Sequence, residues 1–163
     1  MSRSRNTFWA IGLLVLIIGG LGALSLLSDK APQPIAQAAA NTIVVHKSPT
    51  CGCCGKWVDH LKAEGFAVEV RDEEDMNAVK SRLGIPARFA SCHTATVGGY
   101  LIEGHVAAAD IKRLLQEKPK AQGLAVPGMP VGSPGMEVGD KRMPYETLLF
   151  SGEVATTYAR HGE

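Results

Sequence analysis

The sequence carries almost no net charge and lacks a basic stretch of the kind that binds nucleic acid. Its 163 residues include 17 lysines and arginines and 16 aspartates and glutamates, so the formal net charge is +1. This balance excludes nucleic acid as a partner, and it excludes steering of substrates by net charge as a main theme. Hydrophobic residues make up 45% of the chain, which excludes a disordered tail.

Charge is missing altogether from residues 6–28, which form an almost continuous apolar run. Residues 8–27 are long enough to span a bilayer as a helix. Arg3 and Arg5 precede this run, and positive residues stay on the cytoplasmic side, so the rest of the chain is expected outside the inner membrane. We predict that residues 1–40 are a signal peptide or membrane anchor plus a tether, engaging the membrane or the export machinery.

Cleavage of this segment is left open by the sequence. Ala36-Gln37-Ala38 matches a signal-peptidase pattern, but it lies farther past Leu27 than such sites usually do. Residues 41–163 are the second predicted unit, and their length suffices for one core. In a Gram-negative cell this unit would lie in the periplasm, either soluble after cleavage or anchored to the inner membrane by residues 8–27.

The second unit alternates between strand and helix patterns. Runs rich in β-branched residues predict strands, and apolar residues at helical spacing predict helices. The predicted strands are residues 42–46, 66–70, 92–97 and 100–103, and the predicted helices are residues 56–64, 73–83 and 107–118. A strand-helix-strand opening, a later hairpin and a final helix predict an α/β fold, a thioredoxin-like mixed sheet flanked by helices.

The C-terminal part begins without a regular hydrophobic period. Residues 126–139 are rich in glycine and proline and contain two copies of a seven-residue pattern, which carry Met129 and Met136. Strand-like runs at 148–150 and 154–158 predict a closing hairpin. We therefore expect a Gly/Pro/Met loop and a hairpin as a C-terminal extension of the fold.

Only four cysteines are present, and three of them fall within four residues. Cys51 and Cys54 form a C-x-x-C pair at the predicted strand-to-helix junction, where the helix N-terminus favours the thiolate. Cys92 falls in the segment that enters the third strand, which lies against the C-x-x-C loop in a thioredoxin-like fold. All four sulfurs, including that of Cys53, can therefore converge.

The pairing of these cysteines stays open at this point. Four cysteines allow three pairings, and a Cys51–Cys54 disulfide leaves Cys53 unpaired unless Cys92 reaches it. Two structural disulfides are an alternative interpretation for an exported domain. Crowding speaks against that alternative, because bridges between such close residues close loops too short to stabilise a fold much.

The residue types around the cysteines favour copper over other metals. Thiolates bind Cu(I), Zn(II) or iron-sulfur clusters, whereas thioethers bind Cu(I) well and Zn(II) poorly. Met129 and Met136 therefore point to copper, with packing over the domain as the alternative.

Two imidazoles are best placed to join the sulfurs. His93 follows Cys92, and His105 precedes the last predicted helix at the same end of the sheet. Strand alternation would send the side chains of Cys92 and His93 to opposite faces, so a structural role for His93 is the alternative. The histidines at 46, 60 and 161 are interpreted as non-ligands, and Trp57 as core packing.

Three separated motifs resemble the DUF411 family of copper-resistance proteins. They are KSPTCGCCGKW at 47–57, ASCHT at 90–94 and GLAVPGMP at 123–130, and the resemblance covers about residues 43–158. It implies a thioredoxin-like periplasmic protein with redox activity that binds copper through Cys51, Cys53, Cys54 and Cys92. The outer ligands that it implies are Met129, Met136, His93 and His105.

Charge balance indicates the kind of copper site to expect. Four thiolates in one pocket would repel one another unless cations or protons neutralised them. Because thiolate sulfur can bridge metals, we expect several Cu(I) ions to share the four cysteines. This multinuclear site would act in Cu(I)/Cu(II) redox cycling, as a copper-dependent oxidoreductase, or in sequestration as a passive buffer. The expected partners are copper ions and other periplasmic copper-handling proteins.

A metal-free thiol-disulfide oxidoreductase is the alternative function. Cys51 would attack as the thiolate and Cys54 would be the resolving thiol, so these two are the catalytic residues if the protein is redox-active. Cys53 argues against this function, and so does Cys92, which stands where related oxidoreductases commonly present a cis-proline.

Overall fold

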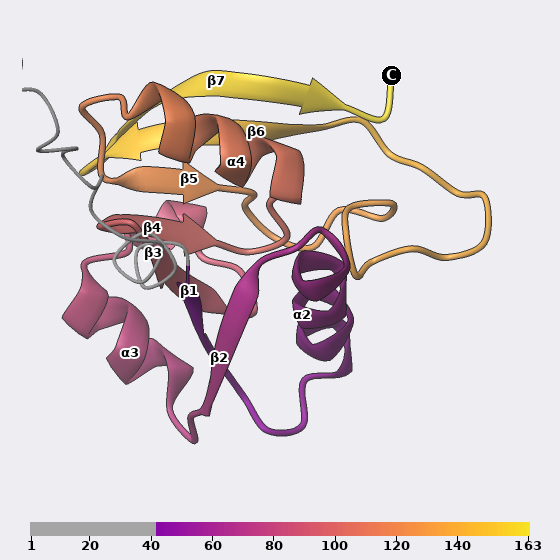
Figure 1. Ribbon diagram of the computed structural model, residues 1–163, viewed down its shortest axis with the longest axis horizontal. Coiled ribbons are helices and arrows are strands. Elements are labelled where there is room, and N and C mark those ends of the chain that lie inside the picture. Colours follow the sequence, from indigo (N-terminus) through magenta and orange to yellow (C-terminus); the bar gives the residue numbers. More distant parts are fainter. Residues whose placement is uncertain (1–41) are drawn as a thin grey trace, which may run out of the picture. The chain divides into compact units, whose positions relative to one another are not determined.

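The computed structural model describes residues 42–163, which form a seven-stranded mixed sheet with helical segments on both faces (Figure 1). The elements in chain order are β1 (Thr42–Lys47), α2 (Gly52–Ala63), β2 (Ala67–Asp72), α3 (Met76–Leu83), the 3-10 turn η1 (Ala87–Phe89), β3 (Thr94–Val97), β4 (Tyr100–Glu103), α4 (Ala108–Glu117), β5 (Gly123–Ala125), β6 (Tyr145–Ser151) and β7 (Val154–His161). The predicted α/β class, a mixed sheet flanked by helices, is confirmed.

The predicted signal peptide or membrane anchor at 1–40, with its apolar run at 8–27, lies outside the described residues. Within residues 42–163, no helix is long and apolar enough to cross a membrane. The division of the chain into 1–40 and 41–163 stays a prediction.

The strand order, β2-β1-β3-β4-β5-β6-β7, gathers four chain segments at one end of the sheet. His46, near the end of β1, pairs with Thr94 at the start of β3, and Thr94 pairs in turn with Glu103 at the end of β4. Glu103 also pairs with Ala125 at the end of β5. The segments that follow β1, β4 and β5, and the one that precedes β3, therefore meet at this end.

Alternate residues of the central strands pack on opposite faces of the sheet. Ile102 and Leu124 belong to the core beneath α2 and α4, where Trp57, Leu61, Ile111 and Leu114 are fully buried. Leu101 and Ala125, one position away on the same strands, belong to a smaller cluster with Phe89 and Phe150 on the other face. The period of two thus divides each strand between two hydrophobic layers.

The helices begin where capping residues place them. The helix predicted at 56–64 begins earlier, at Gly52, because Cys51 is its N-cap and accepts a hydrogen bond from the Cys54 amide. The helix predicted at 73–83 begins later, at Met76, because the Asp75 carboxylate caps the amides of Asn77 and Ala78. The cysteine motif therefore lies in the first turn of α2 rather than in a loop before it.

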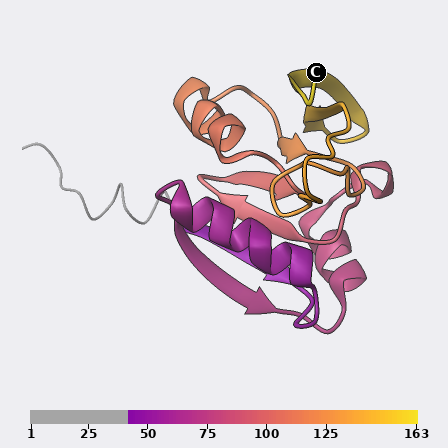
Figure 2. The ribbon, with the colours of Figure 1, turned by 90° about the vertical axis from the view of Figure 1, so that its right-hand side faces the viewer.

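The C-terminal extension is a continuation of the sheet. β5, which the sequence reading did not identify, pairs in parallel with β4 and antiparallel with β6. Gly123 permits this close pairing, because a Cβ there would collide with the Leu101 carbonyl oxygen. The predicted hairpin is confirmed and is longer than predicted, and the Gly/Pro/Met segment becomes a loop over residues 126–144, called the C-terminal loop below. Figure 2 shows this orange loop beside the N-terminal turn of α2.

Candidate metal centre

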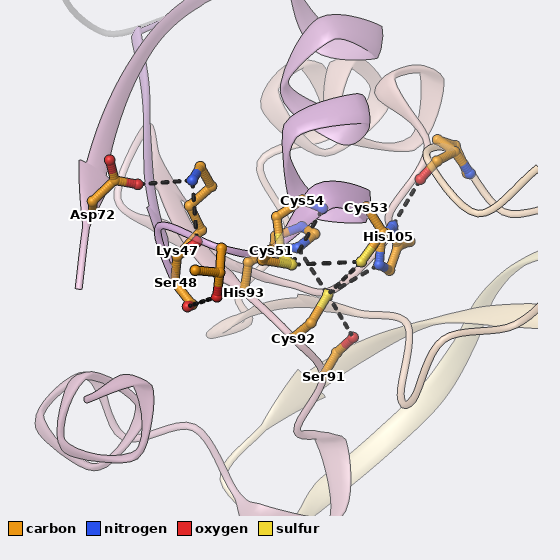
Figure 3. Close-up of a disulfide and its surroundings, with 12 residues drawn as sticks. Lys47, Ser48, Cys51, Cys53, Cys54, Asp72, Ser91, Cys92, His93 and His105 are labelled. Atoms are coloured by element: carbon orange, nitrogen blue, oxygen red, sulfur yellow. Dashed lines mark hydrogen bonds and ion pairs between the residues drawn. A yellow bond between two sulfur atoms is a disulfide. The ribbon is translucent and has the colours of Figure 1, made fainter. Parts of the chain in front are cut away.

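The first turn of α2 carries three of the four cysteines (Figure 3). Cys51 and Cys54 form a disulfide, whereas Cys53 and Cys92 are free thiols. The structure therefore decides the pairing that the sequence left open, and the arrangement with two disulfides is not the one observed.

The four sulfurs lie close together, although Cys92 is far from the others in sequence. Cys53 Sγ is 3.5 Å from Cys51 Sγ and 3.9 Å from Cys92 Sγ. All four Sγ atoms lie within 4.8 Å of one another, so they form a group that could hold a metal ion. We call Cys51, Cys53, Cys54 and Cys92 the sulfur cluster.

Two imidazoles lie beside Cys92. Its Sγ lies 3.2 Å from His93 Nδ1 and 3.0 Å from His105 Nε2, and these three residues form a second group with metal-ligand geometry. The expectation that His93 would point away from Cys92 is wrong, because β3 begins only at Thr94. Cys92 and His93 precede the regular strand, so its alternation does not govern their side chains.

Contacts with the C-terminal loop and the core orient both rings. His105 Nδ1 lies 2.8 Å from the Pro134 carbonyl oxygen, which can only accept, so Nδ1 carries the proton and Nε2 presents a lone pair toward Cys92. His93 packs against Trp57, with ring centroids 4.3 Å apart, and its Nε2 has no hydrogen-bond partner among the described residues. A fully buried imidazole with an unpartnered nitrogen is costly unless another group binds there.

Burial keeps these groups neutral in the metal-free protein. Burial, reinforced by the neighbouring Cys53, raises the pKa of Cys92 to about 12. Burial lowers the pKa of His93 well below its ordinary value, with His105 and Lys80 contributing, and burial also lowers the pKa of His105. A metal at Cys92 must therefore displace the thiol proton, whereas both imidazoles are already in the neutral form that binds metals.

The C-terminal loop closes over the cluster. A Cβ at Gly135 would lie 2.8 Å from the Cys53 carbonyl oxygen, and the Ser91 hydroxyl donates to the Gly128 carbonyl. Met129 is 52% exposed and Met136 is partly buried on this loop. The structure thus brings their loop to the cluster, and their role as ligands stays a prediction.

The remaining histidines and Trp57 make contacts elsewhere. His46 Nδ1 pairs with Glu73 at 2.6 Å, and His161 Nε2 lies 2.8 Å from Asp110 Oδ2. His60 Nε2 accepts a hydrogen bond from the Ala108 amide, the first of α4. Trp57 is fully buried, as expected, and its indole donates to the Val106 carbonyl.

Sequence reasoning missed a buried ion pair next to Cys92. Glu103 Oε1 pairs with Lys80 Nζ, and the same oxygen accepts a hydrogen bond from the Ser91 amide at 2.6 Å. A signal was present, because Lys80 lies four residues after Met76 and three before Leu83, on the apolar stripe of α3. Composition predicts Pro134 and Gly135 only as loop formers, whereas they contact His105 and Cys53.

Comparisons with known proteins agree with this geometry. A family profile described as a protein of unknown function, DUF411, matches residues 89–136. Two solved structures of a copper resistance protein, CopG, are similar to this chain. Form 2 is 49% identical with a TM-score of 0.70, over 74% of this chain and 97% of that chain. Form 1 is 48% identical with a TM-score of 0.70, over 75% of this chain and 98% of that chain. No curated protein sequence matches significantly.

Proposed function

Because the chain belongs to the DUF411 family of CopG-type copper resistance proteins, we propose that it binds copper ions in the sulfur cluster and interconverts Cu(I) and Cu(II). The observation that carries the proposal is the convergence of four cysteine sulfurs within 4.8 Å, with His93 and His105 beside Cys92. Copper is the substrate in this proposal, and the sulfur cluster is its binding site.

The donor set suits copper ions that share ligands. Thiolates are soft ligands that favour Cu(I), and imidazole nitrogen also binds Cu(II). With the Cys51–Cys54 disulfide reduced, four thiolates would hold up to four negative charges in one half-buried site. Several Cu(I) ions bridged by sulfur would neutralise that charge, so a multinuclear site is favoured over a single ion.

The disulfide gives the cluster a place to store electrons. Two Cu(I) ions would each lose one electron, the Cys51–Cys54 bond would break, and two protons from solvent would complete the two thiols. The reverse reaction would form the disulfide and return two Cu(I) ions. Cys53 Sγ, 3.5 Å from Cys51 Sγ, lies beside the bond that would open.

Copper loading under anaerobic conditions tests this function. The reduced protein should bind more than one Cu(I) per chain, with copper and thiols counted on the same sample. Adding Cu(II) to the reduced, metal-free protein should yield one Cu(I) for each thiol lost. Copper bound without any thiol loss would leave a passive buffer as the function.

The Cys51–Cys54 disulfide also favours a second candidate function. A metal-free thiol-disulfide oxidoreductase needs such a pair at a helix N-terminus, and Cys51 is the partly exposed member that an attacking thiol could reach. About zero copper per chain after loading, together with reduction of a disulfide substrate, would put this function first. Cys53→Ser should then leave the turnover of that substrate unchanged.

We further propose that the copper site faces the periplasm. The support is the predicted orientation of residues 1–40, with Arg3 and Arg5 before an uncharged run. Mass spectrometry of the exported form would show whether Ala36-Gln37-Ala38 is cleaved. A domain that protease added outside the inner membrane cannot reach would contradict the proposed location.

A further inference from the structure

A closed group of buried polar side chains lies beneath Cys92. Glu103, the last residue of β4, is fully buried, and its Oε1 accepts from Lys80 Nζ of α3. Thr94 Oγ1 donates to Glu103 Oε2 at 2.6 Å and accepts from Lys80 Nζ at 2.9 Å. We call Lys80, Thr94 and Glu103 the buried polar triad.

Stability alone is a poor explanation for this triad. Removing two charges from water is costly, and hydrophobic residues of similar volume often replace buried ion pairs without loss of stability. The triad also makes one contact that a hydrophobic group could not make. The Ser91 amide donates to Glu103 Oε1 at 2.6 Å, one residue before Cys92.

The Ser91 amide needs this acceptor because its segment has no strand partner. β3 begins at Thr94, which is the first residue of that strand paired with β1, so Ser91 and Cys92 lie outside the sheet ladder. A backbone N–H withdrawn from water must find an acceptor, and a carboxylate is a strong one. The Glu103 side chain therefore takes the place of a ladder carbonyl.

The residue after Glu103 joins the backbone of the second imidazole to this segment. Gly104, next to Glu103, donates its amide to the His93 carbonyl at 3.1 Å, and His105 follows directly. The backbone around Cys92 and His93 is thus joined to the backbone that carries His105 by two neighbouring hydrogen bonds.

We propose that Glu103 is a positioning residue of the copper site. Its carboxylate, held by Lys80 and Thr94, fixes the backbone before Cys92 so that the thiol faces both the other sulfurs and His105. This inference rests on the proposed copper-binding function. Loss of such supporting contacts typically lowers metal affinity by about 10- to 100-fold.

Paired substitutions separate the hydrogen bond from the charges. A single change at Glu103 would leave Lys80 charged, buried and unpaired, so both residues are changed together. Lys80→Met with Glu103→Gln, called the Met/Gln pair below, removes both charges but keeps a carbonyl oxygen for the Ser91 amide. Lys80→Met with Glu103→Leu, called the Met/Leu pair, removes the charges and the acceptor.

Cu(I) affinity, measured by competition with a chromogenic chelator, is the first readout. The Met/Gln pair should bind Cu(I) within about threefold of the unsubstituted protein, whereas the Met/Leu pair should bind about 10- to 100-fold more weakly. Unchanged affinity in the Met/Leu pair would overturn the proposal. Equal losses in both pairs would also overturn it, because the charges and not the hydrogen bond would then matter.

A second buried polar group supplies the matched control. Thr147 Oγ1 donates to Asp110 Oδ2 at 2.7 Å, and His161 Nε2 lies 2.8 Å from the same oxygen, among residues that join α4 to the C-terminal hairpin. Asp110→Asn should lower the free energy of unfolding and leave Cu(I) affinity unchanged. A loss of affinity there as large as in the Met/Leu pair would mean that general destabilisation causes both effects.

Amide hydrogen exchange on the metal-free protein gives a readout that needs no copper. The Ser91 amide should be protected in the unsubstituted protein, and its exchange should accelerate in the Met/Leu pair while that of Ala95 in β3 does not. Exchange of Ser91 at the rate of an unprotected peptide in the unsubstituted protein would overturn the proposal, even if the Met/Leu pair failed to fold. Absence of copper binding with a protected Ser91 amide would instead refute the proposed function and leave the anchoring intact.

Discussion

The helix-covered face of the sheet and its sulfur-lined end hold their side chains by different means. Beneath α2 and α4, residues such as Leu61, Ile111 and Leu114 are fixed by contact with apolar neighbours. At the sulfur-lined end, Cys92 and His105 are fixed by hydrogen bonds to irregular backbone near Ser91 and Pro134. Hydrophobic burial does not depend on direction, whereas hydrogen bonds do. The helix-covered core should therefore govern the free energy of unfolding, and the sulfur-lined end should govern how the candidate ligands are oriented.

The largest expected effect is the loss of copper binding when any one of Cys51, Cys53, Cys54 or Cys92 becomes Ser, because bridging ligands serve more than one ion. Cys53→Ser and Cys92→Ser test the comparison best, since both leave the Cys51–Cys54 disulfide in place. Copper per chain should fall to about zero in either variant, while urea unfolding changes by less than about 1 kcal/mol. Full copper stoichiometry in Cys53→Ser would show that Cys53 is not a bridging ligand.

The reciprocal substitution lies in the core. Leu114 is fully buried in α4, and Leu114→Ala should lower the free energy of unfolding by about 2–5 kcal/mol through lost burial and an unfilled cavity. Copper per folded chain should stay unchanged. A parallel loss of copper, measured below the unfolding transition, would show that the two regions are coupled.

Removing both thioethers should have an intermediate effect. Met129→Ala with Met136→Ala should weaken Cu(I) retention by roughly tenfold and spare Zn(II) binding, because thioether sulfur discriminates between the two ions. Chelator competition for each metal measures the effect, and Met143→Ala, an exposed methionine farther along the same loop, serves as the control. Equal losses for both metals would assign the two methionines to packing.

The smallest expected effect concerns the cap of α4. Burial lowers the pKa of His60, against the opposing charges of Glu64 and Glu137, so the neutral imidazole that accepts the Ala108 amide is favoured. A histidine with a depressed pKa binds fewer protons in the folded state than in the unfolded state. Its contribution to the free energy of unfolding is therefore present above about pH 6.5 and is lost as the pH falls below that value.

His60→Ala should therefore cost about 1 kcal/mol at neutral pH, as loss of a cap does, and should flatten the decline of stability toward acid. Urea unfolding at a series of pH values measures both effects. The decline should persist in part, because the pKa values of His93 and His105 are lowered as well. An unaltered pH profile in His60→Ala would exclude this cap as a source of the decline.

The sequence predicted the core region more completely than the sulfur-lined end. Periodicity suffices for α2 and α4, because apolar residues at helical spacing must pack on the sheet. β5 was not predicted because its three residues, Gly123–Ala125, are too few to show a hydrophobic period. Only their pairing with β4 and β6 makes them a strand.

At the site, residue types and spacing predicted that the four cysteines converge, and the structure brings them together. The direction of His93 could not be predicted, because it depends on where β3 begins. The Lys80–Glu103 pair joins α3 to β4. Local periodicity does not encode contacts between separate elements, so the only sequence signal of this pair is a lysine on the apolar face of α3.

The C-terminal loop starts and ends on neighbouring strands, since Ala125 of β5 pairs with Leu148 of β6. The cost of closing such a loop grows only slowly with its length, and surface loops accept insertions more readily than the strands they join. Residues can therefore be added, removed or exchanged in the exposed part of the loop, 137–144, without shifting the register of the sheet. The earlier part of the loop is held by the contacts of Pro134 with His105 and of Gly135 with Cys53, so sequence variation should concentrate in the exposed stretch and leave the surroundings of the cysteines unchanged.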